Sequence, residues 1–257
     1  MKKPIKLVTD MVKASLQVSS LDDVHSLAAS AVRGFRGLVV VSENRDNPPR
    51  PEKPLEVYDF EACPFCRKVR EAMTELDLSY INRTSAKGAI PTRRQIDEHG
   101  GKQQFPYLVD PNTGEEMYES EDIITYLAET YGPGRGRLSR TLAPVNTAGA
   151  AATSIVRRSG ERVRPGLEER EQPDELPVLY NIEMSPYCRK VREKFNELNL
   201  HYRVENVGKF SARRPELVER GGKMMVPYLI DPNTGTEMYE SDDIVAYLEE
   251  TYGSITE

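Results

Sequence analysis

The chain has 257 residues, of which 38 % are hydrophobic and 30 % are charged, and its formal net charge is -6. This length suits one large domain or two small ones, and the composition is typical of a globular protein. A net negative charge argues against a nucleic-acid partner, which would need a basic surface. Because no apolar run approaches the roughly 18 residues that a membrane span needs, we expect no membrane span.

The first residues and the cysteine content bear on the compartment. The N-terminus is basic, but Asp10 interrupts the apolar core that a secretory signal would need. Three cysteines (Cys63, Cys66 and Cys188) are too few for a disulfide framework. We therefore expect a cytoplasmic protein.

An internal repeat organises the chain. Residues 107–132 and 228–253 are identical at 20 of 26 positions, and the sequence CRKVRE occurs at both 66–71 and 188–193. Similarity at a spacing above 100 residues indicates duplicated domains and not a solenoid. We predict domains at residues 55–132 and 176–253, each just large enough to bury a core of its own.

The first domain is predicted to contain seven elements in the order β-α-β-α-β-β-α. Branched and aromatic residues predict its strands, and prolines in the first turn with apolar residues at helical spacing predict its first helix. Paired glycines end the second helix, and the sequence DPNTG closes a hairpin. The first two strands should be parallel, with a right-handed crossover. The elements are expected at residues 55–60, from 64, at 78–82, 91–101, 105–110 and 116–118, and from 120.

The second domain repeats this pattern, and two further segments lie outside it. Its elements are expected at residues 176–182, from 186, at 200–204, 214–222, 226–231 and 237–239, and from 241. Residues 1–54 predict a helical N-terminal extension that ends in a proline-rich joint. We interpret residues 133–175 as a linker with a short helix, with a self-association surface as the alternative.

The chemistry is expected at the sequence Cys63-Pro64-Phe65-Cys66. A C-x-x-C motif that joins a strand to a helix in a βαβ unit is typical of thiol–disulfide redox sites. Cys63 would lie at the helix N-terminus, where free N–H groups and the helix dipole stabilise a thiolate, so it is the expected nucleophile. Cys66, one turn inside the helix, would attack the mixed disulfide as the resolving thiol.

Charges near this motif oppose one another. Arg67 and Lys68 would lower the pKa of Cys63, whereas Asp59 and Glu61 would raise it, so the direction of the shift does not follow from the sequence. Half of a zinc site is the alternative role for the two thiols. The chain has no second C-x-x-C and only three His, and we expect no metal.

Three motifs in fixed order, present in both repeats, resemble a known family. CPFC, then Phe105-Pro106, then Glu119-Ser120 followed by Ile123 resemble the glutaredoxins and the N-terminal domain of glutathione transferases. The resemblance implies an α/β protein with two tandem thioredoxin-fold (glutaredoxin-like) domains. It also implies glutathione as the cosubstrate.

The resemblance further implies a glutathione site in the first domain. In the family the proline is cis, the backbone of the residue before it pairs with the cysteinyl part of glutathione, and the Glu-Ser pair holds the γ-glutamyl end. The free N–H groups at a helix start can bind the carboxylate of the γ-glutamyl end. Taken alone, the Glu-Ser pair would be an ordinary N-cap, and the proline would only shape a strand. The implied residues are Gln104, a candidate for the glycyl carboxylate, with Phe105, Pro106, Glu119 and Ser120.

The second domain departs from the pattern at its first cysteine. The sequence Ser185-Pro-Tyr-Cys188 keeps only the resolving position, so dithiol chemistry is excluded within this domain, and we expect Cys188 to be a buried, inert thiol. In some transferase classes a serine at this position holds the glutathione thiolate. Met225 stands where the first domain has Gln104. A degenerate structural or substrate-docking domain is the alternative. The implied second site consists of Ser185, Val226, Pro227, Glu240 and Ser241.

We expect a glutathione-dependent thiol–disulfide oxidoreductase that acts on disulfides or glutathionylated proteins through Cys63 and Cys66. Two other classes remain open. One is a transferase- or isomerase-type enzyme that uses bound glutathione, although only residues 133–175 stand where typical glutathione transferases have a helical domain. The other is a non-catalytic thioredoxin-fold scaffold.

Overall fold

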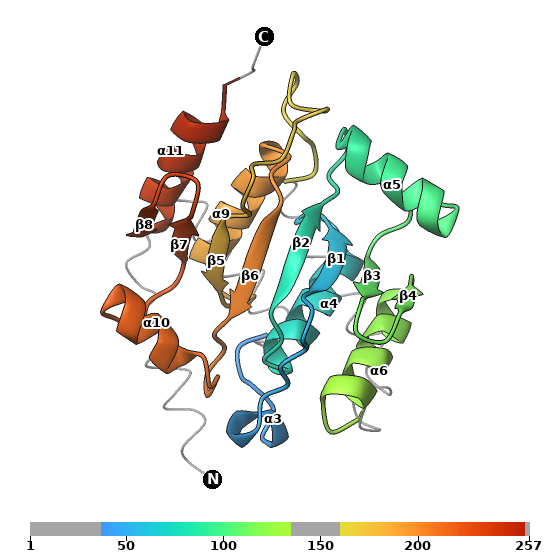
Figure 1. The fold of residues 1–257 in the computed structure, drawn as a ribbon, viewed down its shortest axis with the longest axis vertical. Helices are drawn as coiled ribbons and strands as arrows, with labels where there is room; N and C mark the ends of the chain where they lie inside the picture. Colours follow the sequence, from blue (N-terminus) through green and yellow to red (C-terminus); the bar gives the residue numbers. More distant parts are fainter. Residues whose placement is uncertain (1–36, 135–159, 255–257) are drawn as a thin grey trace.

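The computed structural model describes residues 37–134 and 160–254, which we call the first and second half. Their eight strands form one continuous sheet, in the order β4-β3-β1-β2-β6-β5-β7-β8 (Figure 1). The strands are β1 (Leu55–Asp59), β2 (Tyr80–Thr84), β3 (Tyr107–Asp110), β4 (Glu115–Met117), β5 (Val178–Asn181), β6 (Tyr202–Asn206), β7 (Tyr228–Asp231) and β8 (Thr236–Tyr239). The helices are α3 (Glu43–Asp46), α4 (Pro64–Glu75), α5 (Ile90–Gly100), α6 (Ser120–Tyr131), α9 (Pro186–Glu197), α10 (Arg214–Gly221) and α11 (Ser241–Tyr252).

Each half repeats the predicted topology. β1 pairs with β2 in parallel and with β3 antiparallel, and β3 and β4 form the hairpin, as do β5 to β8 in the second half. The predicted α/β class with two thioredoxin-fold domains is confirmed. The second strand of each half begins two residues later than expected, because the backbone N–H groups of Leu78 and Leu200 donate to carbonyls of the preceding helix. The exact boundaries of the two domains stay predictions.

The two halves join through β2 and β6, a pairing that the sequence does not predict. These strands run antiparallel, with Ile81 opposite Arg203. In separate domains both strands would be edges with unpaired backbone groups, and their pairing removes those edges. A single hydrophobic cluster contains buried residues of both halves, and in it the rings of Phe195 and Tyr202 stack 4.1 Å apart. The hydrophobic core therefore continues from one half into the other, and whether each domain could bury a core of its own stays a prediction.

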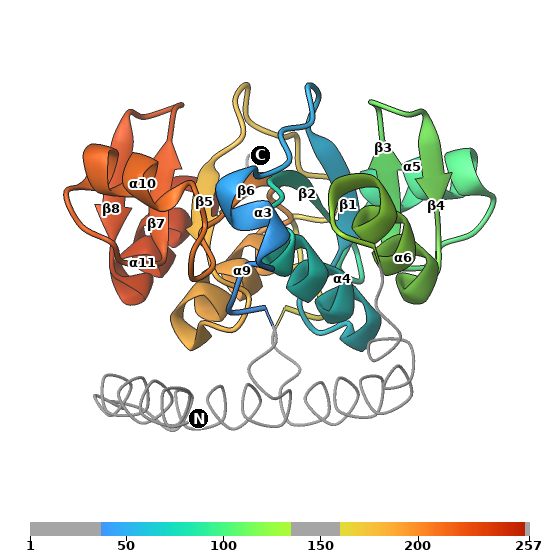
Figure 2. The same cartoon turned by 90° about the horizontal axis from the view of Figure 1, so that it is seen from below.

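Four helices cover one face of the sheet. Figure 2 shows α11, α9, α4 and α6 side by side beneath the strands. The opposite face of the four central strands is turned toward the viewer in Figure 1, and no helix of residues 37–134 or 160–254 crosses it there. Apolar residues at helical spacing, such as Val69 and Met73 on α4, are fully buried against the sheet.

The segment before each domain pairs with the other half. The Val40 N–H donates to the Lys209 carbonyl over 3.0 Å, and the Lys209 N–H donates to the Leu38 carbonyl. In the same way Lys87 exchanges two backbone hydrogen bonds with residues 161 and 163. Of the predicted N-terminal extension, residues 1–36 lie outside the described residues, as do residues 135–159 of the predicted linker.

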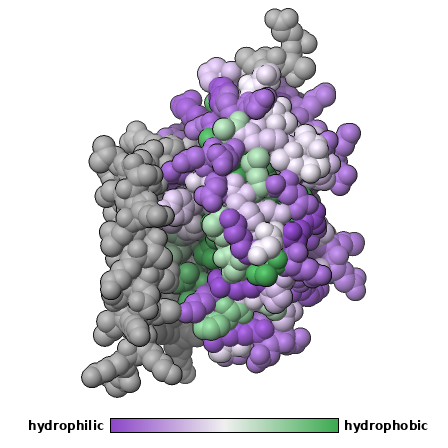
Figure 3. All heavy atoms as spheres, turned by 90° about the vertical axis from the view of Figure 1, so that its left-hand side faces the viewer, coloured by the Kyte–Doolittle hydropathy of each residue, from purple (hydrophilic) through white to green (hydrophobic). Residues whose placement is uncertain are grey.

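The outer side of the second half is mostly hydrophilic. In Figure 3, which views the molecule from the left-hand side of Figure 1, hydrophobic residues reach the described surface only in small areas. Within residues 37–134 and 160–254, no helix combines the length and the apolarity that crossing a membrane requires.

Candidate active site

Cys63 is the N-cap residue of α4. Its backbone is extended, and Pro64 occupies the first helical position, where the missing N–H leaves no hydrogen bond unmade. The N–H of Cys66 donates to Cys63 Sγ over 3.2 Å. One of the free N–H groups of the helix start is therefore directed at the sulfur, as a thiolate there requires.

The two thiols of the motif have pKa values shifted in opposite directions. Burial raises the pKa of Cys63, but hydrogen bonds from the thiol and the N–H of Cys66 outweigh it, and the net shift is downward. Burial and the neighbouring Cys63 raise the pKa of Cys66 well above its ordinary value. The direction that the sequence left open thus depends mainly on Cys66 and not on Arg67 or Lys68.

Cys63 is less exposed to solvent than a position at a helix start suggests. Its side chain is only 5 % exposed. The Phe105-Pro106 peptide bond is cis, as the resemblance implies, and the Phe105 carbonyl lies 4.0 Å from Cys63 Sγ. The rings of Phe60 and Phe105 meet edge to face beside it, while Phe65, inside the motif, is 45 % exposed. A substrate would therefore approach the sulfur past aromatic side chains.

The structure brings Gln104 and Glu119 together at the start of α6. The Gln104 side-chain amide donates to the Glu119 carboxylate over 2.5 Å. Glu119 is the N-cap residue, but its side chain makes no capping hydrogen bond, and its φ of 66° lies in the left-handed region. The reading of the Glu-Ser pair as an ordinary N-cap is therefore wrong. Backbone strain of this kind in a non-glycine residue is typical of binding sites.

The second half reproduces this geometry around Ser185. Ser185 caps α9, and its Oγ accepts a hydrogen bond from the Cys188 N–H over 3.3 Å. The Val226-Pro227 bond is cis, and Glu240 has the same φ of 66° as Glu119. Ser241, like Ser120, is buried at its helix start, and Met225 is half-buried where Gln104 would be.

Cys188 is fully buried, as predicted, and burial raises the pKa of its thiol. The buried position follows from its place one turn inside α9. A thiol in such a position reacts slowly, because the thiolate is the reactive form.

Two basic residues near the motif pair with carboxylates. Arg67 pairs with Glu71 on its own helix, and Lys68 pairs with Glu121 on α6. Arg93, which the sequence did not single out, stacks on the ring of Phe105 with 4.8 Å to the ring centre. The sequence did not mark Arg93 as a site residue, because arginines on helices are common and are usually exposed.

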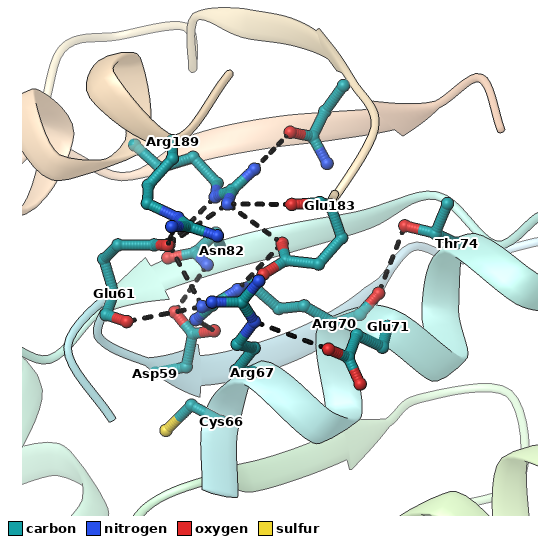
Figure 4. A network of polar contacts seen from close by, with 12 residues as sticks. Asp59, Glu61, Cys66, Arg67, Arg70, Glu71, Thr74, Asn82, Glu183 and Arg189 are labelled. Carbon is teal, nitrogen blue, oxygen red and sulfur yellow. Dashed lines mark hydrogen bonds and ion pairs between the residues drawn. The ribbon is translucent and has the colours of Figure 1, made fainter. Parts of the chain in front are cut away.

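A buried cluster of charges behind the motif was also missed. Arg70, which is 1 % exposed, pairs with Asp59, with Glu61 and with Glu183 of the second half (Figure 4). The signal that could have found it is the arginine at the fifth position of the repeated CRKVRE sequence, since Arg70 directly follows the buried Val69 and lies three residues before the buried Met73.

A family model described as the glutathione S-transferase N-terminal domain matches residues 57–136 and 179–255. The chain belongs to this family. The matches together span more than half of the chain, and each contains one copy of the site geometry described above.

One solved structure, titled "Leishmania TDR1 - a unique trimeric glutathione transferase", is also similar to this chain. It shares 15 % sequence identity, and the similar region covers 79 % of this chain and 68 % of that chain. The TM-score is 0.29, and we base no argument on it. A search of curated proteins found no match.

Proposed function

We propose that this member of the glutathione S-transferase N-terminal domain family is a glutathione-dependent thiol–disulfide oxidoreductase. The observation that carries the proposal is the helix start, where Cys63 and Cys66 lie on one turn and the Cys66 N–H donates to Cys63 Sγ over 3.2 Å. Hydrogen bonds from Cys66 lower the pKa of Cys63, while burial raises the pKa of Cys66. A lowered pKa gives the attacking thiolate, and a raised pKa keeps the second thiol protonated until it is needed.

The proposed reaction has three steps. The Cys63 thiolate attacks one sulfur of a disulfide, and the other sulfur leaves as a thiolate that takes up a proton. Cys66 loses its proton and attacks Cys63 in the mixed disulfide, which forms the Cys63–Cys66 disulfide and releases the second thiol. Two glutathione molecules then reduce this disulfide and are oxidised to glutathione disulfide.

Glutathione is proposed to bind beside Cys63 through the residues that the family resemblance implies. The backbone of Phe105, before the cis Pro106, would pair with the cysteinyl part, since its carbonyl lies 4.0 Å from Cys63 Sγ. Glu119 and Ser120 at the start of α6 would hold the γ-glutamyl end. Gln104 contacts Glu119 and stays a candidate for the glycyl carboxylate.

The test is reduction of the mixed disulfide between glutathione and 2-mercaptoethanol, with glutathione as the reductant. We expect Cys63→Ser to abolish turnover. Cys66→Ser should keep part of it, because glutathione itself can resolve a mixed disulfide with Cys63. Ser185→Ala is the matched control in the other half and should leave the rate unchanged. Folded wild-type protein that does not turn over would refute the proposal.

A transferase that uses bound glutathione is the second candidate. It is favoured by Ser185, whose hydroxyl occupies in the second half the N-cap place of Cys63 in the first. Conjugation of glutathione to 1-chloro-2,4-dinitrobenzene that survives Cys63→Ser but not Ser185→Ala would select it. Loss of both activities in folded protein would favour the scaffold. Disulfide or glutathionylated protein substrates and a cytoplasmic location belong to the oxidoreductase proposal.

A further inference from the structure

Arg70 connects the parts of the chain that build the candidate active site. It lies on α4, one turn beyond Cys66, and its Nη1 donates to Asp59 Oδ2 over 2.7 Å at the end of β1. Its Nη2 is 3.1 Å from Glu61 Oε2, in the loop that leads to Cys63. Arg70 therefore holds the strand end, the loop and the helix in one arrangement behind the two cysteines.

The third partner of Arg70 comes from the other half of the molecule. Arg70 Nε donates to Glu183 Oε2 over 3.1 Å, and both side chains are almost completely buried (Figure 4). In return Arg192 donates from two nitrogens to the carboxylate of Glu61, over 2.9 and 3.1 Å. Each buried arginine thus binds the glutamate that precedes the motif of the opposite half.

The exchange is not symmetrical in charge. Asp59 is the carboxylate that Arg70 binds at the end of its own strand, whereas Arg192 binds the neutral amide of Asn181 over 2.6 Å. The extra carboxylate therefore lies in the half that carries the two cysteines. It raises the pKa of both thiols, and Arg70 opposes it.

We infer that the second half of the chain is part of the thiol site, with Glu183 as a positioning residue that acts on Cys63 through Arg70. This inference rests on the proposed function, because it concerns the same nucleophile. Glu183 offsets part of the charge of Arg70, so that less of that charge stabilises the Cys63 thiolate. A serine-variant domain with this role need not carry out chemistry of its own.

The effect can be separated from the other charges around the site. The charged and titratable groups around Cys63, Cys66 and Arg70 include Asp59, Glu61, Arg67, Tyr80, Arg93, Glu183, Arg189 and Arg192. Glu183→Gln removes one negative charge from this set and keeps the shape of the side chain. Coulomb's law then predicts a more positive surrounding and a lower pKa of Cys63.

The experiment measures the alkylation rate of Cys63 by iodoacetamide from pH 5 to 10 in the full chain, with each cysteine quantified by mass spectrometry. For Glu183→Gln we expect the midpoint of the Cys63 pH–rate profile to fall by about half a pH unit to one pH unit. The rate below the midpoint should rise about two- to fourfold, since a less basic thiolate is also less nucleophilic. Glu183→Asp, which withdraws the carboxylate by one methylene, should shift the midpoint in the same direction by less.

The matched control is Asp231→Asn, a buried carboxylate of the second half that binds Tyr247 and Tyr252 and not Arg70. It should lower stability without moving the Cys63 profile. If the profile of Glu183→Gln coincides with that of the wild type, the inference is wrong. If Glu183→Gln does not fold, a Glu183→Asp profile that coincides with the wild-type profile also shows that the inference is wrong. The alkylation profile does not require turnover, so a failure of the reductase assay and a failure of this inference are told apart.

Discussion

Cys63 and Ser185 occupy the same place in the two halves of the molecule. Each is the N-cap of a twelve-residue helix, and each accepts a hydrogen bond from the N–H three residues later, over 3.2 Å to sulfur and 3.3 Å to oxygen. The two halves therefore share a helix start that can stabilise a negative charge, and they differ in the atom placed there.

The first prediction concerns Ser185→Cys in a Cys63→Ser background. This change restores a C-P-Y-C dithiol in the half that contains the cis Pro227, and the helix start should lower the pKa of the new thiol. We expect measurable reduction of a glutathione mixed disulfide, slower than wild type because Met225 offers no amide. A folded but inactive variant, with a thiol that titrates like a free one, would show that the second half has lost its site and not only its nucleophile.

The second prediction concerns the relative reactivity of the three cysteines. Cys63 should react fastest with a brief pulse of iodoacetamide at neutral pH, because its pKa is lowered while those of Cys66 and Cys188 are raised. Its low exposure should keep the absolute rate modest. Peptide mapping measures the label at each site, and predominant labelling of Cys188 would contradict the assigned roles.

The third prediction concerns oxidation. Mild oxidation should join Cys63 and Cys66, which lie on one helix turn and in which the Cys66 N–H already donates to Cys63 Sγ. Cys188 should stay reduced, since it is fully buried within the other half. Non-reducing peptide mapping decides between this outcome and a Cys63–Cys188 bridge, which would imply a relay between the halves.

Local features of the sequence predicted the local structure well. Pro64 and Pro186 marked the helix starts. Runs of branched and aromatic residues placed the strands, and apolar residues at helical spacing placed the helices, within about two residues. The cis bonds before Pro106 and Pro227 followed from the resemblance. These features succeed because each depends on residues that are neighbours in the chain.

The join between the halves could not be predicted in this way. Whether β2 stays an edge or pairs with β6 depends on a strand about 120 residues away, and the pairing leaves no local pattern. Arg70 and Glu183 show the same difficulty. Charged residues on a helix or in a loop indicate a solvated surface by default, and only the assembled halves reveal that these two are buried against each other.

The fourth prediction tests the strength of the other buried contact between the halves, that of Arg192 with Glu61. Arg192→Leu removes both hydrogen bonds to Glu61 and leaves its carboxylate buried with fewer partners. We expect the free energy of unfolding to fall by about 3–5 kcal/mol. Arg203→Leu is the control, because Arg203 is half-exposed and its pair with Glu205 should contribute at most about 1 kcal/mol. Urea denaturation measures the free energy of unfolding of both variants. Equal losses in Arg192→Leu and Arg203→Leu would mean that the buried contact between the halves contributes little to stability.

The last prediction concerns acid stability and His201, a residue of the second half that contacts the first. His201 Nδ1 lies 3.1 Å from Thr84 Oγ1, and the backbone N–H of His201 donates to Gln172 Oε1 over 2.7 Å. Burial lowers the pKa of the imidazole to about 3, with a smaller contribution from Arg83. The folded protein therefore holds this ring neutral at pH values where the unfolded chain protonates it.

Because the folded pKa lies below the unfolded value near 6.5, this contribution is fully present above pH 6.5 and is lost as the pH falls toward 3. Between pH 7 and pH 5 the wild type should lose about 2 kcal/mol of unfolding free energy through His201. His201→Gln loses the contact of the ring with Thr84, so the variant should be less stable at pH 7. Because glutamine does not titrate, the variant should lose correspondingly less unfolding free energy on acidification. Urea denaturation at pH 7, 6 and 5 measures the difference between the two proteins, in which the shared carboxylate contributions cancel. Parallel losses in the two proteins would show that His201 is protonated in the folded state or that its contact with Thr84 opens in solution.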